Sequence, residues 1–353
     1  MKLRHAFLSV MIVGLSISCS NDDDQGKGTE PLGAYENGIL VSNEGPFSNG
    51  SGTVSFISND LSVTENGIFK KINNEDLGNI VHSIGFTEDE AFIVANVSNK
   101  INVVNRSTFE KTGSITEGLE NPRYFAVSNG KGYVTNWGDA ADDTDDFVAI
   151  IDLQDYVVEG TIPVDFGVDA IIAKGTTLYV AHQGGYGHNN IVSVINTLTN
   201  EVIKTITVGD APNSMKFDAA GNLWVLASGK PDYTQDETAG VLSKINTATN
   251  EVTATFQFDT TQHPGLLNME GNDLYFYLGN TVYKQDVSAT ALSMEEVLNE
   301  AGIYTMAINE GKLYATNAGD FASNGTLTVY DLSTKQAVET ITVGIIPGGI
   351  YFN

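Results

Sequence analysis

Hydrophobic positions along the chain follow the two-residue period of β-strands rather than the longer period of helices. Beyond the first 18 residues, short segments rich in Val, Ile, Thr, Tyr and Phe are separated by turns of Gly, Asn and Asp. This pattern predicts antiparallel strands joined by tight turns and almost no helix. The exception is at residues 293–296, where the order Ser-Met-Glu-Glu matches a capping box and predicts the start of a short helix.

The strand segments also repeat one another. The stretch INTLTNEV at residues 195–202 returns as INTATNEV at residues 245–252, and residues 330–335 form a third copy. Each copy predicts a strand, a polar turn and a return strand. With one strand directly before each hairpin and another upstream, the unit holds four antiparallel strands over about 40–50 residues, the size of a propeller blade.

Seven such units follow one another when they are counted by their second strands. These strands are expected at residues 39–43, 91–96, 132–136, 178–182, 223–228, 274–278 and 313–317. The first unit lacks an innermost strand, and the chain ends in one at residues 346–352 that has no blade after it. The sequence therefore predicts an all-β domain over residues 36–353, a seven-bladed β-propeller of four-stranded antiparallel blades. Its C-terminal strand would complete the first blade and close the ring, which leaves no free sheet edge.

The long loops predict a binding face. In four-stranded blades, the loop between the second and third strands lies on the same face as the crossover to the next blade. All long loops are expected to be of this kind, at residues 43–52, 136–146, 182–190, 228–240 and 317–325, with short turns opposite. Aromatic residues in these Gly/Asn-rich loops have little local core to join, so we expect ligand contacts from Phe47, Trp137, Tyr186, Tyr233 and Phe321. The alternative is that each ring packs under its own loop.

Polar residues at the mouth of the expected central channel are further candidates. The crossovers supply Arg123, Tyr124, Asp169, Asn213, His263 and Tyr304, and a long loop supplies His188. Arg123 is notable because basic residues are scarce, and an ion pair with the acidic surface is an equally good interpretation. A propeller hydrolase or lyase would need polar residues that converge on a central metal, and the candidates at such positions are Asp169, Asn213 and His263.

One long loop is dense in carboxylates. Asp142, Asp143 and Asp145, with Asp139 and Asp146, could supply oxygen ligands to Ca²⁺, although the turn glycine and closing glutamate of a known calcium loop are missing. A solvated loop is the alternative. The sequence contains no Gly-x-Ser-x-Gly elbow, Walker loop, His-Glu-x-x-His or CxxC pair. We therefore expect no catalytic residues and no required cofactor.

The N-terminal segment predicts where the protein resides. Lys2 and Arg4 precede an apolar run at residues 6–17 and then small residues, the order of a signal peptide, here residues 1–18. The run is too short to span a bilayer core of about 30 Å. The only cysteine, Cys19, follows directly and is expected to be lipidated at the start of the mature chain, the alternative being a chance cysteine. Residues 19–35 are polar and predict a flexible tether.

The charge balance excludes one class of partner. The chain has 44 acidic and 18 basic residues, for a net charge of −26. Such a surface repels nucleic acid and anionic membranes, so we expect no nucleic-acid partner and membrane contact only through the lipid anchor.

Three short motifs carry a family resemblance. The stretch NEGPFSNGSGTVSF at residues 43–56 resembles the opening motif of Bacteroidetes surface lipoproteins of the YncE-like propeller type, and residues 136–138 and 317–319 resemble its later copies. The acidic run after Cys19 resembles the export signal of such lipoproteins. The resemblance covers residues 36–353 and implies a lipid-anchored, surface-exposed protein of the outer membrane. It further implies capture of a small nutrient, with cobalamin or another corrinoid as the best single ligand, for delivery to a TonB-dependent transporter.

Two other functions remain open at this point. The same loop face could bind a protein or a glycan as a non-catalytic scaffold. A metal-dependent hydrolase or lyase would instead need a metal bound tightly in the channel.

Overall fold

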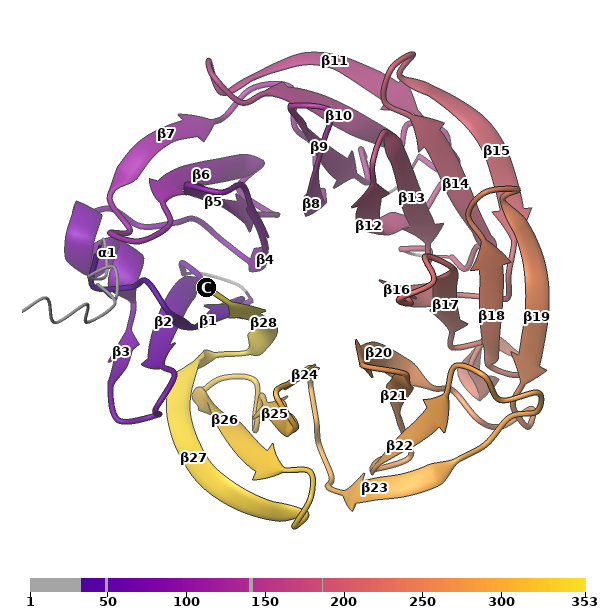
Figure 1. Ribbon diagram of the computed structural model, residues 1–353. Helices are drawn as coiled ribbons and strands as arrows, with labels where there is room; N and C mark the ends of the chain where they lie inside the picture. Colours follow the sequence, from indigo (N-terminus) through magenta and orange to yellow (C-terminus); the bar gives the residue numbers. More distant parts are fainter. Residues whose placement is uncertain (1–32, 48–49, 140–141, 186) are drawn as a thin grey trace, which may run out of the picture. The chain divides into compact units, whose positions relative to one another are not determined.

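Seven four-stranded antiparallel sheets stand around a common axis in the described part of the chain (Figure 1). The structure is a computed structural model that describes residues 33–47, 50–139, 142–185 and 187–353. The predicted signal peptide, Cys19 and Tyr186 lie outside these residues. The described residues form one compact unit. The seven-bladed propeller predicted from the sequence is therefore confirmed.

Each blade is ordered from the channel outward, and each innermost strand contacts the innermost strand of the next blade. Blade 1 consists of β28 (Pro347–Phe352), β1 (Gly38–Asn43), β2 (Thr53–Ser58) and β3 (Thr64–Asn66). Blade 2 consists of β4 (Val81–Phe86), β5 (Glu90–Ala95), β6 (Lys100–Asn105) and β7 (Lys111–Ile115). Blade 3 consists of β8 (Pro122–Ser128), β9 (Lys131–Asn136), β10 (Phe147–Asp152) and β11 (Val157–Pro163).

The remaining blades keep the same order. Blade 4 consists of β12 (Val168–Lys174), β13 (Thr177–His182), β14 (Ile191–Asn196) and β15 (Glu201–Thr207). Blade 5 consists of β16 (Pro212–Phe217), β17 (Leu223–Ala227), β18 (Val241–Asn246) and β19 (Glu251–Gln257). Blade 6 consists of β20 (Gly265–Glu270), β21 (Asp273–Leu278), β22 (Thr281–Asp286) and β23 (Glu295–Asn299). Blade 7 consists of β24 (Met306–Asn309), β25 (Lys312–Asn317), β26 (Asn324–Asp331) and β27 (Gln336–Ile345).

The C-terminal strand closes the ring, as the sequence predicts. β28 pairs antiparallel with β1, with Val41 opposite Ile350. The side chain of the last residue, Asn353, donates hydrogen bonds to the carbonyl oxygens of Tyr35 (2.6 Å) and Arg106 (3.0 Å). The chain end is therefore tied to the segment before β1 and to blade 2.

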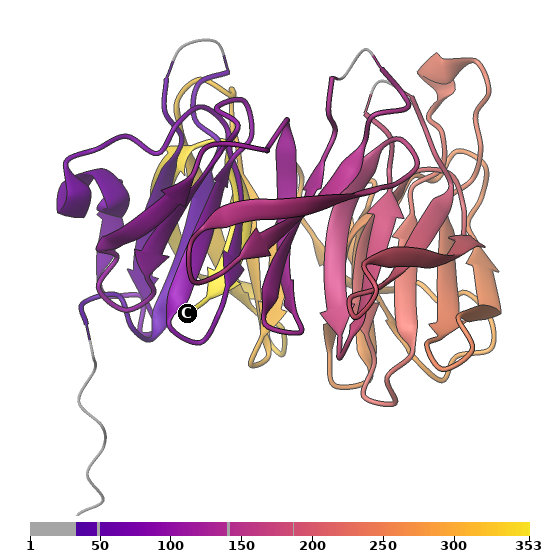
Figure 2. The same cartoon turned by 90° about the horizontal axis from the view of Figure 1, so that it is seen from above.

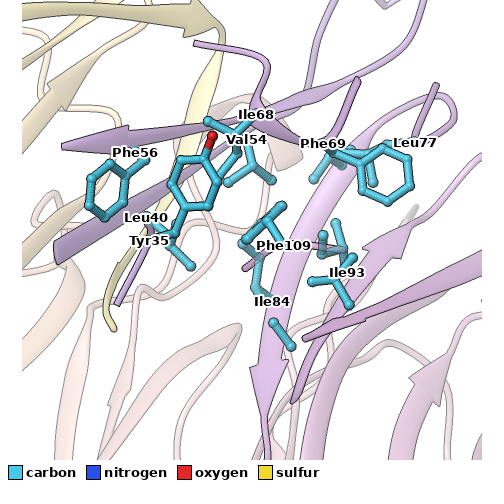
Figure 3. Close-up of a cluster of buried hydrophobic side chains, with 13 residues drawn as sticks. Tyr35, Leu40, Val54, Phe56, Ile68, Phe69, Leu77, Ile84, Ile93 and Phe109 are labelled. Atoms are coloured by element: carbon cyan, nitrogen blue, oxygen red, sulfur yellow. The ribbon is translucent and has the colours of Figure 1, made fainter. Parts of the chain in front are cut away.

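Adjacent blades bury both faces of each sheet, which explains why some strands are apolar almost throughout. All six residues of β1 are buried. Between blades 1 and 2, Leu40 and Val54 pack with Ile84 and Ile93 in one cluster (Figure 3). Full burial of one such side chain stabilises the fold by about 1.5–3 kcal/mol.

Two local predictions are wrong. Residues 295–299 form strand β23 and not a helix, because Val297 is buried in the cluster between blades 6 and 7 while its two neighbours toward the N-terminus, Glu295 and Glu296, are exposed. A short helix, α1 (Ile68–Asn73), instead lies between β3 and β4 and buries Ile68 and Phe69. The flexible tether expected over residues 19–35 also extends too far along the chain, since Tyr35 is only 2% exposed.

No helix in the described part of the chain has the length and apolar character that a membrane span requires.

Candidate binding face

Five long loops lie on one face of the ring, here called the loop face. They join the second and third strands of blades 1, 3, 4, 5 and 7, and Figure 2 shows them rising on the same side. One long loop departs from the prediction. Residues 287–294 join the third and fourth strands of blade 6 and therefore lie on the opposite face. The five long second-to-third-strand loops nonetheless make the loop face the more elaborate one.

Three of the predicted loop aromatics are exposed. Phe47 is 83% exposed, Tyr233 is 79% exposed and Phe321 is 54% exposed. Tyr233 stands in a short 3-10 helix, η1 (Asp232–Thr234). The ring of Phe321 contacts that of Tyr304 edge to face, with centroids 5.6 Å apart. These side chains leave apolar surface in water on three different loops, a typical property of recognition sites.

The Phe321 loop is held in shape by local hydrogen bonds. The backbone N–H groups of Ala322 and Ser323 donate to Asp320 Oδ1 at 3.0 and 2.7 Å. Phe321 itself has a left-handed backbone with φ of 60°, which is unfavourable for a residue with a large side chain. The loop therefore presents its ring in a conformation that neighbouring contacts maintain.

Trp137 and Arg123 form a packed unit rather than a free surface. Arg123 Nε donates to Asp169 Oδ1 at 2.9 Å, and the two side chains are 15% and 6% exposed. The guanidinium carbon lies 3.9 Å from the Trp137 ring centroid, and the indole N–H of Trp137 donates to the Val168 carbonyl. Trp137 is half-buried, so it packs under its loop. Arg123 takes the ion-pair role that was the alternative to ligand binding, and it joins blade 3 to blade 4.

Glu44 is a site residue that sequence reasoning missed. The hydroxyl of Tyr304 donates to Glu44 Oε1 at 2.9 Å, which joins blade 7 to blade 1 beside the channel mouth. Burial raises the pKa of Glu44, while the Tyr304 hydrogen bond and the charge of Arg123 oppose that rise. Burial, followed by the charge of Glu44, raises the pKa of the Tyr304 hydroxyl. The position of Glu44 inside the 43–56 motif is the signal that could have found it.

The other polar candidates mostly hold blades together. Asn213 Nδ2 donates to the Pro264 carbonyl at 3.2 Å. His263 places Nδ1 at 2.9 Å from the Ser228 carbonyl oxygen and Nε2 at 3.2 Å from Glu237. His188 lies half-buried in the loop between β13 and β14. The structure therefore places Asp169, Asn213 and His263 in separate contacts.

The Asp-rich loop uses its carboxylates locally. Asp142 Oδ1 accepts from the amide and hydroxyl of Thr144, and Asp145 Oδ2 accepts from the Asp139 amide. Asp143 is exposed. Within the described residues, no three His, Cys, Asp or Glu side chains are grouped as a metal site. Calcium binding by Asp142, Asp143 and Asp145 stays a prediction.

Asp146, at the end of the same loop, is buried. Its Oδ2 accepts the backbone N–H groups of Gly167 (2.7 Å) and Val168 (3.0 Å), so it fixes the start of blade 4 to blade 3. Burial raises the pKa of Asp146 to about 6 even though both N–H groups favour the charged form. Neutralising this carboxyl should therefore stabilise the fold.

Comparisons with known proteins agree with this fold class. Among solved structures, the chain is similar to a quinonprotein alcohol dehydrogenase-like protein from Bacteroides thetaiotaomicron, at 14% identity and a TM-score of 0.64 over 90% of this chain and 78% of that one. It is also similar to the hydrazine synthase of Kuenenia stuttgartiensis, at 18% identity and a TM-score of 0.53 over 76% and 88% of the two chains. The dihydro-heme d1 dehydrogenase NirN matches at 13% identity and a TM-score of 0.56 over 91% and 76%.

At these identities the likeness shows the propeller fold alone, although two of the neighbours carry the names of enzymes. The chain belongs to the family described as a domain of unknown function, DUF5074, whose model matches residues 37–343. No curated protein matches the chain.

Proposed function

We propose that this protein is a non-catalytic, lipid-anchored binding protein of the outer cell surface that captures a small nutrient on its loop face. The observation that carries the proposal is the exposure of Phe47, Tyr233 and Phe321 on three loops of that face. An aromatic side chain contributes a large apolar contact area at small loss of conformational entropy, so exposed rings on one face favour recognition.

A corrinoid is the ligand that this surface and the family resemblance together favour. Corrinoids are large, flat rings edged with amide side chains. The loop face offers aromatic rings for the apolar surface and exposed amides for the edge, on Asn190, Gln235 and Asn324. Delivery to a TonB-dependent transporter in the outer membrane, with Cys19 carrying the lipid, completes the proposal and rests on the resemblance.

A three-residue variant tests the proposed face. Phe47→Ala, Tyr233→Ala and Phe321→Ala combined should abolish co-elution of cyanocobalamin with the purified protein in gel filtration. The matched control combines Val157→Ala, Leu198→Ala and Val338→Ala, which also remove exposed apolar side chains but lie away from the loop face. Equal co-elution with both variants would contradict the assignment.

A protein or glycan partner is the second candidate. The observation that favours it is the protrusion of Phe47 and Tyr233, since a small-molecule pocket buries its aromatic walls more deeply. In that case cyanocobalamin does not bind. Instead, the protein retains a surface component from membrane fractions, and the three-residue loop variant loses it.

A further inference from the structure

The innermost strands of the seven blades stand around a common axis (Figure 1). Residues of these strands line a channel of about 620 Å³. Its lining is mainly apolar, and the partly exposed side chains of Ile172, Leu266, Met269 and Ile350 belong to it. A volume of this size falls within the usual range of small-molecule sites. The channel is therefore large enough for a ligand of its own, below the loop face.

The charge of the channel is opposite to that of the chain. No Asp or Glu occurs among the residues that line it, although the chain has 44 acidic residues. Its one lysine is Lys216, near the end of β16. All innermost strands start at the crossovers, so Lys216 lies toward the channel end opposite the loop face.

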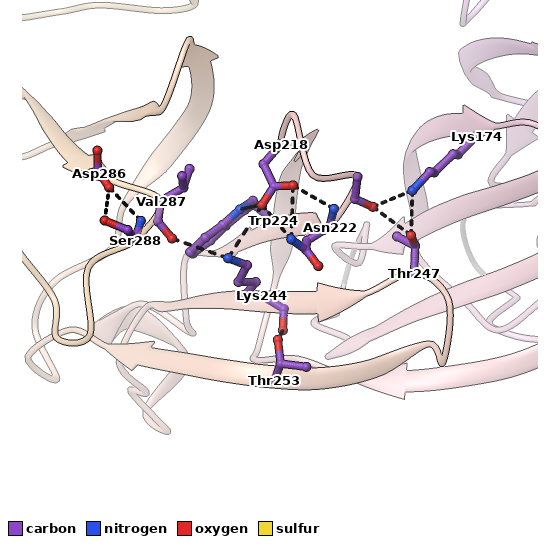
Figure 4. A network of polar contacts seen from close by, with 11 residues as sticks. Lys174, Asp218, Asn222, Trp224, Lys244, Thr247, Thr253, Asp286, Val287 and Ser288 are labelled. Carbon is purple, nitrogen blue, oxygen red and sulfur yellow. Dashed lines mark hydrogen bonds and ion pairs between the residues drawn. The ribbon is translucent and has the colours of Figure 1, made fainter.

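Lys216 differs from the other lysines of this region in having no partner among the described residues. Lys174, on the innermost strand of blade 4, donates to the Gly221 carbonyl (2.6 Å) and to Thr247 Oγ1 (2.7 Å) (Figure 4). Lys244 lies 3.7 Å from Asp218 and over the Trp224 ring. No hydrogen bond or ion pair joins Lys216 to another described residue, and burial lowers its pKa.

An ammonium group in apolar surroundings is unfavourable unless it is paired or neutralised. We propose that the central channel binds a small amphipathic monocarboxylate, whose carboxylate pairs with Lys216 and whose aliphatic body lies along the apolar inner strands. One cation in an apolar lining matches one negative charge on the ligand. A phosphate dianion would need several further donors near Lys216. This site is independent of the aromatic loops and of the function proposed for them.

Calorimetric titration with octanoate, using octanol as the uncharged control of equal length, tests the proposal. Octanoate should bind at least about tenfold more tightly than octanol, the ratio expected from one charged hydrogen bond. In Lys216→Met, which keeps the apolar stem, octanoate should bind about tenfold or more weakly while octanol binding persists. Lys174→Met is the matched control and should bind octanoate like the unaltered protein.

Thermal melting gives a second readout that does not depend on titration heats. Octanoate should raise the melting temperature of the unaltered protein and not that of Lys216→Met. Without ligand, Lys216→Met should melt higher than the unaltered protein, because a half-buried ammonium without a partner among the described residues has been removed. The loop variant at Phe47, Tyr233 and Phe321 should bind octanoate normally, which separates this site from the loop face.

Three results would overturn the proposal. They are an absence of octanoate binding, equal affinities for octanoate and octanol, and unchanged octanoate affinity in Lys216→Met.

Discussion

The hydroxyl of Tyr304 and the carboxylate of Glu44 meet at 2.9 Å across the seam where blade 7 adjoins blade 1. Glu44 follows β1 directly, and Tyr304 lies in the crossover that leads into β24. The contact therefore holds the start of the Phe47 loop next to the crossover that contains Tyr304. The ring of Tyr304 in turn packs against Phe321. The junction between the first and last blades thus helps to position two loops of the loop face.

Removing this hydroxyl should weaken the seam. We expect Tyr304→Phe to lower the free energy of unfolding by about 1–3 kcal/mol, because the half-buried Glu44 carboxylate loses its hydrogen-bond donor. Chemical denaturation at neutral pH measures the change. Tyr233→Phe removes an exposed hydroxyl on the same face and should have no effect. Equal stability of the two variants would show that the contact is not stabilising.

The Arg123–Asp169 ion pair gives a larger effect. Arg123→Met should lower stability by about 3–5 kcal/mol, since it leaves the buried Asp169 carboxylate without its partner. The double variant Arg123→Met, Asp169→Asn should recover part of that loss, and a double-mutant cycle by denaturation measures the coupling. Additive losses would contradict the pairing.

Asp146 should make stability depend on pH. Its pKa is raised from 3.8 to about 6 in the folded protein, so its contribution to stability is present below about pH 4 and is lost as the pH rises through about 6. Asp146→Asn keeps an oxygen for the Gly167 and Val168 amides without the charge. Above pH 6 it should be more stable than the unaltered protein by about 2–3 kcal/mol.

That difference should shrink toward zero as the pH falls to about 4. Denaturation midpoints between pH 4 and 8 provide the test. Asp143→Asn removes an exposed charge from the same loop and serves as the control. A difference that does not change with pH would be inconsistent with a raised Asp146 pKa.

The repeated turn at Asn200 joins blades 3 and 4. Asn200 has a φ of 56°, and the Tyr133 hydroxyl donates to its Oδ1 at 3.1 Å. Asn200→Gly should lower the free energy of unfolding by about 1 kcal/mol, because the hydrogen bond is lost. Asn200→Ala should lower it by about 1–2 kcal/mol more, because alanine is strained in the left-handed conformation. Tyr133→Phe should match the glycine variant. Thermal or chemical denaturation of the three variants measures these changes. Equal free energies of unfolding for Asn200→Gly and Asn200→Ala would exclude backbone strain at this position.

The repeated hairpins made the fold predictable because each strand depends mainly on its own alternation and on a short turn. Asn200 and Asn250 occupy the same position in the two most similar repeats, and each accepts a tyrosine hydroxyl from the preceding blade. The unpaired strand at the C-terminus likewise determined how the ring closes. Local signals failed at residues 293–296, where burial of Val297 between blades outweighs the capping pattern.

The candidate site was less predictable because its contacts join distant parts of the chain. The loop sequences indicated that Phe47, Tyr233 and Phe321 would be exposed. They could not show that Trp137 donates to Val168, 31 residues away, or that Glu44 meets Tyr304, 260 residues away. The sequence did not indicate that Lys216 would lack a partner, since this depends on the residues that seven separate strands place around the channel.

Calorimetric titration of the purified protein with cyanocobalamin is the most direct test of the proposed function. We expect one corrinoid to bind per chain. The variant with alanine at Phe47, Tyr233 and Phe321 should bind at least about a hundredfold more weakly, as expected for the loss of three aromatic contacts of about 1 kcal/mol each. The absence of binding by the folded protein would contradict corrinoid capture, and equal binding by the variant would contradict the loop face as its site.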